Sequence, residues 1–227
     1  MTPEATALAL MQLSDSALPT GAFSHSLGFE SYMQREQVTD EDGFAAWLEM
    51  FVEQQLTFTD ALAIRLVHAA RGFDEVAELD ELVTAQAVPQ QIRDGGRTMG
   101  RRLLSIGAES YPSDWVLRYQ SGVADGSLQA HQATVWGVLT RSLGVSADEA
   151  AASHLYATII SLTQNAVRGI PLGQNTGQRV IRRAQQWVSR SVAVSRDLGP
   201  EDLGAIAPGL EIAQMNHERQ RARLFMS

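Results

Sequence analysis

The sequence of 227 residues contains no cysteine and no lysine. Without cysteine the chain has no disulfide bond, no thiolate metal ligand and no cysteine nucleophile, which is compatible with a reducing compartment. All 18 basic residues are arginine, so the chain lacks the lysine that a P-loop places on nucleotide phosphates and the amine of a Schiff base. Nucleotide hydrolysis by a Walker-type site of its own is therefore excluded.

Long hydrophobic runs are also missing. No stretch reaches the roughly 18 apolar residues that a membrane-spanning helix needs, and Thr2–Leu13 has no basic region of the kind that opens a signal peptide. We therefore expect no transmembrane helix and no secretory leader, and we expect a cytoplasmic protein.

Strand patterns are the third absence. We find no sustained alternation of apolar and polar residues, and no Asn-Gly or Asp-Gly turn between such runs. Apolar residues recur instead at helical spacing along most of the chain. The sequence predicts an all-α fold, a single compact bundle of roughly eight to ten helices that forms one domain over residues 1–227.

The helical pattern gives specific expectations. One helix should cover Thr39–Ala70, and another should follow the cap signal at Ser146 and end near Ile170. The second has two neighbouring apolar stripes, which predicts that it is the central helix. Trp115–Tyr119 is predicted to be a short helix, and Leu198–Leu210, which contains Pro200, Gly204, Pro208 and Gly209, is predicted to be a loop.

One predicted helix carries two rows of residues spaced by four. Gly96 and Gly100 form one row, and because each glycine costs a helix about 1 kcal/mol relative to alanine, they indicate that another backbone passes close by. Arg93, Arg97 and Arg101 form the other row. This row is either a surface for an acidic partner or an internal ion-pair face, and the sequence leaves both open.

The charge is unevenly distributed. Residues 1–90 hold 15 acidic residues and 3 arginines, a net charge of −12, whereas residues 91–227 hold 11 acidic residues and 15 arginines, a net charge of +4. An acidic half joined to a mildly basic half favours protein–protein contacts of opposite sign. Nucleic acid is not indicated as a partner, because no strongly basic face with interleaved aromatic residues is present.

The stretch Ser14–Glu30, SDSALPTGAFSHSLGFE, differs most from ordinary helical sequence. Pro19 and Gly21 predict a sharp turn between two helices. Two interpretations of the corner Ser24-His25-Ser26 stay open: a Ser/His nucleophile site, or a structural turn with a half-buried histidine. The structural turn is favoured, because a Ser–His pair depends on geometry rather than adjacency and no G-x-S-x-G elbow is present.

No catalytic or metal-binding pattern appears elsewhere. The histidines are His25, His68, His131, His154 and His217. None of them lies in an H-x-x-x-H or H-E-x-x-H arrangement, and no dinucleotide-binding glycine pattern is present. We therefore predict no catalytic residue, no metal ligand and no cofactor.

Three segments carry a resemblance to a known family. Leu10–Glu30 fits the pattern L-x-Q-L-x-(S/D)-x-x-x-P-x-G-x-(F/Y)-x-(H/Y/W)-S-x-G-(L/F)-E. Ala166–Arg179 contains V-R-x-x-P-(L/F)-G-Q, and Glu211–Ser227 contains M-x-H-E-x-Q-x-x-R-L-F-x-S. These segments resemble the urease accessory protein UreF family. Three motifs in the right order from one end of the chain to the other are far more specific than one alone.

The resemblance implies a non-catalytic chaperone of urease maturation. Members of the family are all-helical homodimers that join UreD (also called UreH) and the GTPase UreG. The complex delivers nickel to the urease apoprotein and allows carbamylation of its active-site lysine. The absence of a P-loop here agrees with GTP hydrolysis by the partner. A GTPase-activating role towards UreG, with an arginine finger from Arg97 or Arg101, is a further alternative, as is the hydrolase at the Ser24–Ser26 corner.

The resemblance also assigns residues. The partner-binding residues it implies are His217, Glu218, Arg219, Arg223, Leu224 and Phe225 in the C-terminal segment, and Pro171, Leu172, Gly173 and Gln174 in the loop before it. The matching positions of the N-terminal motif are Pro19, Gly21, Phe23, His25, Ser26, Gly28 and Glu30. The sequence does not separate folding from contact in that motif.

The C-terminal segment, residues 211–227, mixes charged and apolar residues. Two interpretations stay open. The segment is a partner-binding tail that is mobile alone and becomes ordered when a partner buries Leu224 and Phe225, or it is an ordinary packed chain end.

Overall fold

The computed structural model describes residues 1–204 and 207–227, and within these ranges it contains helices and no strand. The α-helices are α1 (Pro3–Ser14), α2 (Phe29–Gln34), α3 (Glu41–Met50), α4 (Leu62–Ala69), α5 (Phe73–Gln86), α6 (Gln90–Ser110), α7 (Asp114–Asp125), α8 (Gln132–Ser142), α9 (Ala147–Gly169), α10 (Gln174–Ser195) and α11 (Pro208–His217). Shorter pieces are the 3₁₀ turns η1 (Ala22–Ser24) and η3 (Pro200–Asp202) and the π-helical η2 (Phe51–Ala61).

Because η2 joins α3 to α4 without a break, the described residues form ten helices in a compact arrangement. The predicted all-α fold is confirmed, and so is the helix expected over Thr39–Ala70. Its π-helical middle, where Thr57 donates a hydrogen bond to the carbonyl of Val52 (3.0 Å), was not predicted. None of the described helices combines the length and the hydropathy that a bilayer-spanning segment needs.

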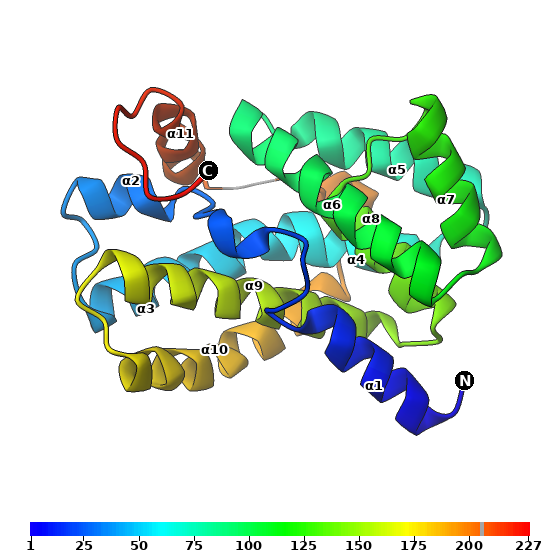
Figure 1. Ribbon diagram of the computed structural model, residues 1–227, viewed down its shortest axis with the longest axis horizontal. Helices are drawn as coiled ribbons and strands as arrows, with labels where there is room; N and C mark the ends of the chain where they lie inside the picture. The colour runs from blue at the N-terminus through cyan, green and yellow to red at the C-terminus, as the bar shows by residue number, and fades with distance from the viewer. Residues whose placement is uncertain (205–206) are drawn as a thin grey trace.

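Helix α9 is the central helix, as predicted, and crosses the middle of the molecule in Figure 1. It packs against α4, α8, α10 and η2 and also contacts α1 and α2. A capping box starts it: Ser146 Oγ accepts from the amide of Glu149 (3.2 Å), and the Glu149 carboxylate accepts from the amide of Ser146 (3.1 Å). Two polar side chains of this helix have partners elsewhere in the chain: His154 contacts Asp60, and Asn165 donates to the carbonyl of His25.

An aromatic cluster fixes the short helix α2 on α3. The ring of Phe29 meets that of Phe44 edge-on, with centroids 5.2 Å apart, and it meets Trp47 at 5.1 Å. Trp47 in turn stacks on Phe51 at 5.2 Å. Phe29 and Phe44 are fully buried, and burial of a phenylalanine contributes roughly 1.5–3 kcal/mol. The cluster therefore holds the residue after Phe29 in a fixed place.

Part of the charge asymmetry is used inside the chain. Arginines of α10 pair with the acidic face of the α3–η2 helix: Arg190 contacts both Glu49 and Glu53 at 2.6 Å, and Arg179 contacts Glu41 at 2.7 Å. These pairs are half-exposed, so each contributes little stability alone. They nevertheless show that the two oppositely charged halves face each other along α10.

Two of the sequence expectations were wrong. Trp115–Tyr119 is part of a longer helix, α7, that ends at Asp125, and Gly126 with its φ of 84° follows it. Gly122 lies inside this helix, where a side chain would collide with Leu128. The loop predicted over Leu198–Leu210, of which residues 205 and 206 lie outside the described residues, contains η3 and the start of α11 at Pro208. Proline is well suited to the first helical turn, so it marked a helix start rather than an interruption.

The close backbone approach predicted from the α6 glycines is confirmed at Gly100. A Cβ atom there would collide with the backbone of Ala130, and with the amide nitrogen of Gln132 at 3.0 Å, whereas at Gly96 it would only touch the His131 ring at 3.5 Å. Ala130 itself has a φ of 62°. The buried carboxylate of Asp80 holds this turn, accepting from the amides of residues 129, 130 and 131 at 2.6–3.2 Å.

Gly100→Ala is therefore expected to destabilise the protein by about 1–3 kcal/mol or more, because a rigid backbone cannot move away as a side chain can. Gly72→Ala is the matched control: that glycine has nothing within 4 Å and an ordinary φ of −146°, so the loss should stay under about 1 kcal/mol. Urea unfolding monitored by circular dichroism compares the two. Equal stabilities would contradict the close approach.

The end of α4 carries a histidine that is kept neutral. His68 Nε2 lies 3.0 Å from Thr140 Oγ1, which donates to the carbonyl of Trp136 and so accepts from the ring. Arg141 donates to the carbonyls of Val67 and Ala70, both at 2.7 Å. Burial, with the nearby guanidinium groups of Arg141 and Arg65, lowers the pKa of His68 to about 4.

Below pH 6.5 the unfolded chain therefore takes up a proton at His68 that the folded chain takes up only near pH 4. Because proton uptake by the unfolded state favours unfolding, the free energy of unfolding should fall through this group by up to about 3 kcal/mol between these pH values. His68→Gln keeps a donor to Thr140 but cannot titrate. Urea unfolding at pH 7 and near pH 4.5 should show a smaller pH dependence in the variant; an identical dependence would contradict the assignment.

Candidate functional site

The N-terminal motif folds into a tight corner between α1 and α2. Gly21 (φ 86°) precedes η1, and Leu27 (φ 53°) and Gly28 (φ 97°) precede α2. A Cβ at Gly28 would lie 2.8 Å from Gln214 Cγ and 3.0 Å from Leu210 Cδ1. Gly28 therefore serves both the left-handed turn and the close passage of α11.

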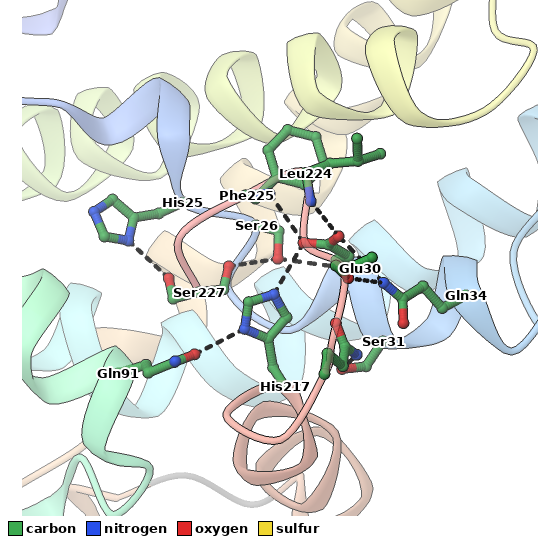
Figure 2. A network of polar contacts seen from close by, with 12 residues as sticks. His25, Ser26, Glu30, Ser31, Gln34, Gln91, His217, Leu224, Phe225 and Ser227 are labelled. Carbon is green, nitrogen blue, oxygen red and sulfur yellow. Dashed lines mark hydrogen bonds and ion pairs between the residues drawn. The ribbon is translucent and has the colours of Figure 1, made fainter.

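Glu30, the second residue of α2, is the centre of the site and is fully buried. Its carboxylate accepts from the backbone amides of Leu224 (2.6 Å) and Phe225 (3.0 Å), and Nε2 of His217 lies 2.9 Å away (Figure 2). Gln34 donates to it from the next helical turn at 3.3 Å. A buried carboxylate needs a charged partner and several donors, and here the C-terminal segment supplies most of them.

His217 ties Glu30 to α6 as well. Its Nδ1 lies 2.7 Å from Gln91 Oε1, and the ring is fully buried. Both ring nitrogens face oxygen atoms, one on α6 and one on α2. Beside it, Glu218 accepts from the amide of Gln90 at 3.0 Å. The end of α11 is therefore fastened to α2 and α6 together.

Residues 224–227 lie along the N-terminal corner and alternate in burial. Phe225 and Ser227 are buried, whereas Leu224 and Met226 are exposed. Backbone bonds join the two segments: Met226 N–H donates to the Ser24 carbonyl (2.7 Å), and Ser26 N–H donates to the Ser227 carbonyl (2.5 Å). Ser26 Oγ donates to that same carbonyl. These contacts explain why Ser26 of the motif is fully buried.

The middle motif, Ala166–Arg179, reaches the same place through Arg168 near the end of α9, and Asn165 lies just before it. Asn165 donates to the His25 carbonyl (2.7 Å), and Arg168 donates to the Phe23 carbonyl (2.6 Å) and to Asn165 Oδ1. The Arg168 guanidinium also lies 5.2 Å from the centre of the Phe225 ring. We call this assembly of residues 23–30, Asn165, Arg168, His217 and residues 224–227 the Glu30 site.

The structure separates the residues assigned by the resemblance into two groups. Within the C-terminal segment, His217 and Phe225 are buried, whereas Glu218, Arg219, Arg223 and Leu224 are exposed. The loop Pro171–Gln174 lies between α9 and α10, with Leu172 in the core and the other three residues exposed. Its residues are not among the hydrogen-bonding partners of the Glu30 site.

In the N-terminal motif, Gly21, His25, Ser26, Gly28 and Glu30 are buried, whereas Pro19 and Phe23 are exposed. The sequence did not identify Gln34, Gln91 and Ser227 as members of the site. A polar residue at a helix surface or a chain end is common, so its identity alone does not indicate that it belongs to a site. Asn165 did give one, because it lies on the apolar central helix and needed a partner.

The corner Ser24-His25-Ser26 does not have the geometry of a nucleophile site. Ser24 Oγ donates to the Gly21 carbonyl at 2.7 Å, and Nδ1 of His25 lies 2.7 Å from the hydroxyl of Ser227, not from either neighbour. Burial, with the nearby Arg102, lowers the pKa of His25. Cavities do adjoin this histidine, but both predicted nucleophiles donate to carbonyl oxygens.

Other histidines have structural partners. His154 Nε2 lies 2.9 Å from Asp60, and His131 Nδ1 accepts from the amide of Ala133 at 3.3 Å. Across residues 1–204 and 207–227, no group of three potential side-chain ligands comes together. Of the arginine row on α6, Arg93 donates to the carbonyls of Ala87 and Val88, and no ion pair involves the row within these ranges.

Comparison with known proteins agrees with the arrangement of the motifs. The UreF family model matches residues 38–185. Three curated proteins named urease accessory protein UreF are similar over 97% of this chain and 96% of their own length. They come from Kocuria rhizophila (72% identical), Corynebacterium efficiens (56%) and an Arthrobacter species (54%). The chain belongs to the urease accessory protein UreF family. The family model covers neither the N-terminal motif nor the C-terminal segment, whereas the alignments to relatives extend into both.

Glu30→Ala is expected to release residues 224–227, because two backbone amides and His217 lose their acceptor at once. The amides of Leu224 and Phe225 should exchange with solvent about 10–100 times faster, as measured by hydrogen exchange. Glu4→Gln, on the exposed face of α1, is the control and should leave their exchange unchanged. Unaltered protection in Glu30→Ala would mean that other contacts hold the segment.

Proposed function

We propose that this protein is an assembly factor without catalysis of its own, which joins UreD (UreH), UreG and the urease apoprotein in the cytoplasm so that nickel reaches the urease active site. The observation that carries this proposal is the convergence of the three motif segments on the Glu30 site. At this site the hydroxyls of Ser24 and Ser26 and the imidazoles of His25 and His217 are all engaged in contacts within the chain. Such an arrangement fits a contact surface better than a reaction centre.

The two groups of residues have different roles in this proposal. Glu30, His217 and Phe225 hold the C-terminal segment in place, because they are buried and cannot touch a partner in this conformation. The exposed residues of the segment, including Arg219 and Leu224, contact UreD. A segment already ordered before binding loses less conformational entropy on association than a mobile one.

The remaining partners use other surfaces. UreG binds a separate face, and its own site hydrolyses GTP. The protein acts as a homodimer, and the exposed loop residues Pro171, Gly173 and Gln174 belong to the same assembly. Nickel passes to urease only in the complete complex. The contribution of this chain is to adopt the one conformation in which the partners can assemble.

The test is co-expression of tagged protein with UreD and UreG, followed by affinity purification and light scattering. The full-length chain should recover all three proteins, and a chain ending at Leu210 should lose UreD. Glu30→Ala should recover UreD with reduced yield, because its exposed contact residues remain but are no longer held. Recovery of UreD by the truncated chain with unchanged urease activation would refute the assignment of the contact surface.

A further inference from the structure

Three large apolar side chains are exposed at the rim of the Glu30 site. Phe23 is 55% exposed, Leu224 67% and Met226 62%. They come from opposite ends of the sequence, and the backbone bond from Met226 N–H to the Ser24 carbonyl, next to Phe23, brings them together. Single exposed apolar residues are ordinary, but a group of them on one surface marks an interaction site.

Their exposure is fixed by the structure. Phe225, between Leu224 and Met226, is buried against Gly169 and Arg168, so its two neighbours face away from the protein. The carbonyl of Phe23 accepts from Arg168, which holds the backbone there. The backbone that carries the three side chains is therefore held at both ends of the group.

The charged residues around this group are mainly positive. Arg168, Arg219, Arg221 and Arg223 are exposed, and no ion pair involves them within residues 1–204 and 207–227. Two exposed carboxylates also adjoin the group, because Asp94 and Glu218 line a pocket together with Met226. Glu218 additionally accepts from the amide of Gln90, and Glu30 is buried. Arg179 and Arg190 of α10, and Arg196 directly after it, differ because they are paired with carboxylates.

We infer that Phe23, Leu224 and Met226 form one contact surface for a partner protein whose matching surface is apolar at its centre and rich in carboxylates at its rim. This inference rests on the proposed function and names the chemistry of the partner bound there. It also assigns a contact role to one residue of the N-terminal motif, Phe23, while the buried residues of that motif hold the site together. A protein is favoured over nucleic acid, because the centre holds one aromatic ring and the chain carries a net charge of −8.

The apolar part is tested with Phe23→Ala and Met226→Ala, measuring binding to purified UreD by biolayer interferometry. Each should weaken binding about tenfold or more, as expected for anchors at the centre of an interface. Met11→Ala on α1 is the matched control: Met11 is 69% exposed, and α1 lies far from the C-terminal end in Figure 1. Its affinity should stay within about twofold of the wild type.

The charged part is tested with Arg221→Glu and Arg223→Glu combined, against Arg182→Glu on the exposed face of α10. The double variant should bind UreD about tenfold more weakly, mainly through slower association, and its binding should be less sensitive to salt. The α10 variant should behave as the wild type.

The outcomes separate the two proposals. If the apolar and charge variants bind normally while the chain ending at Leu210 does not bind, the site stands and its inferred chemistry is wrong. If the truncated chain also binds UreD, the proposed function of the segment fails. If the arginine variants instead lose binding to a single-stranded RNA or DNA probe that the wild type retains, the partner is a nucleic acid and the inference is overturned.

Discussion

The burial of the Glu30 carboxylate is the constraint on which the site depends. Taking a carboxylate out of water costs several kcal/mol unless charged and hydrogen-bonding partners replace the solvent. The partners of Glu30 are one residue of its own helix, the imidazole of His217 and the amides of Leu224 and Phe225. Since the last three lie almost a full chain length away, α2 and the C-terminal segment satisfy each other and are incomplete apart.

The rest of the fold places this carboxylate. The aromatic cluster of Phe29, Phe44 and Trp47 sets α2 on α3, and Gly28 allows α11 to pass at van der Waals distance. The central helix α9 contributes Asn165 and Arg168 at its end, which bind the carbonyls of the corner. A site built in this way is rigid because each of its segments is held by a different part of the core.

The arginines of the chain fall into two groups, those paired within the fold and those left exposed. Arginines of α10 pair with carboxylates of the α3–η2 helix and so hold two parts of one chain together. Arginines of the C-terminal segment carry exposed positive charge beside exposed apolar side chains. Charges already paired contribute to the fold, whereas exposed charges beside apolar residues are available to a partner. In the assembly role proposed above, this surface is where specificity should lie.

The sequence by itself determined the helical class, the extent of the helix over Thr39–Ala70, the central position of α9 and the close approach at Gly100. Each depends on local periodicity, capping or the cost of glycine, which a single chain displays directly. It also indicated the family through three motifs. It did not reveal that these motifs meet, that His217 contacts Glu30, or that Arg190 pairs with both Glu49 and Glu53. Contacts between residues more than a hundred positions apart leave no local pattern, because helix packing brings them together. Only the tertiary structure could therefore divide the motif residues into those that are buried to hold the site and those, such as Phe23 and Leu224, that remain on its surface.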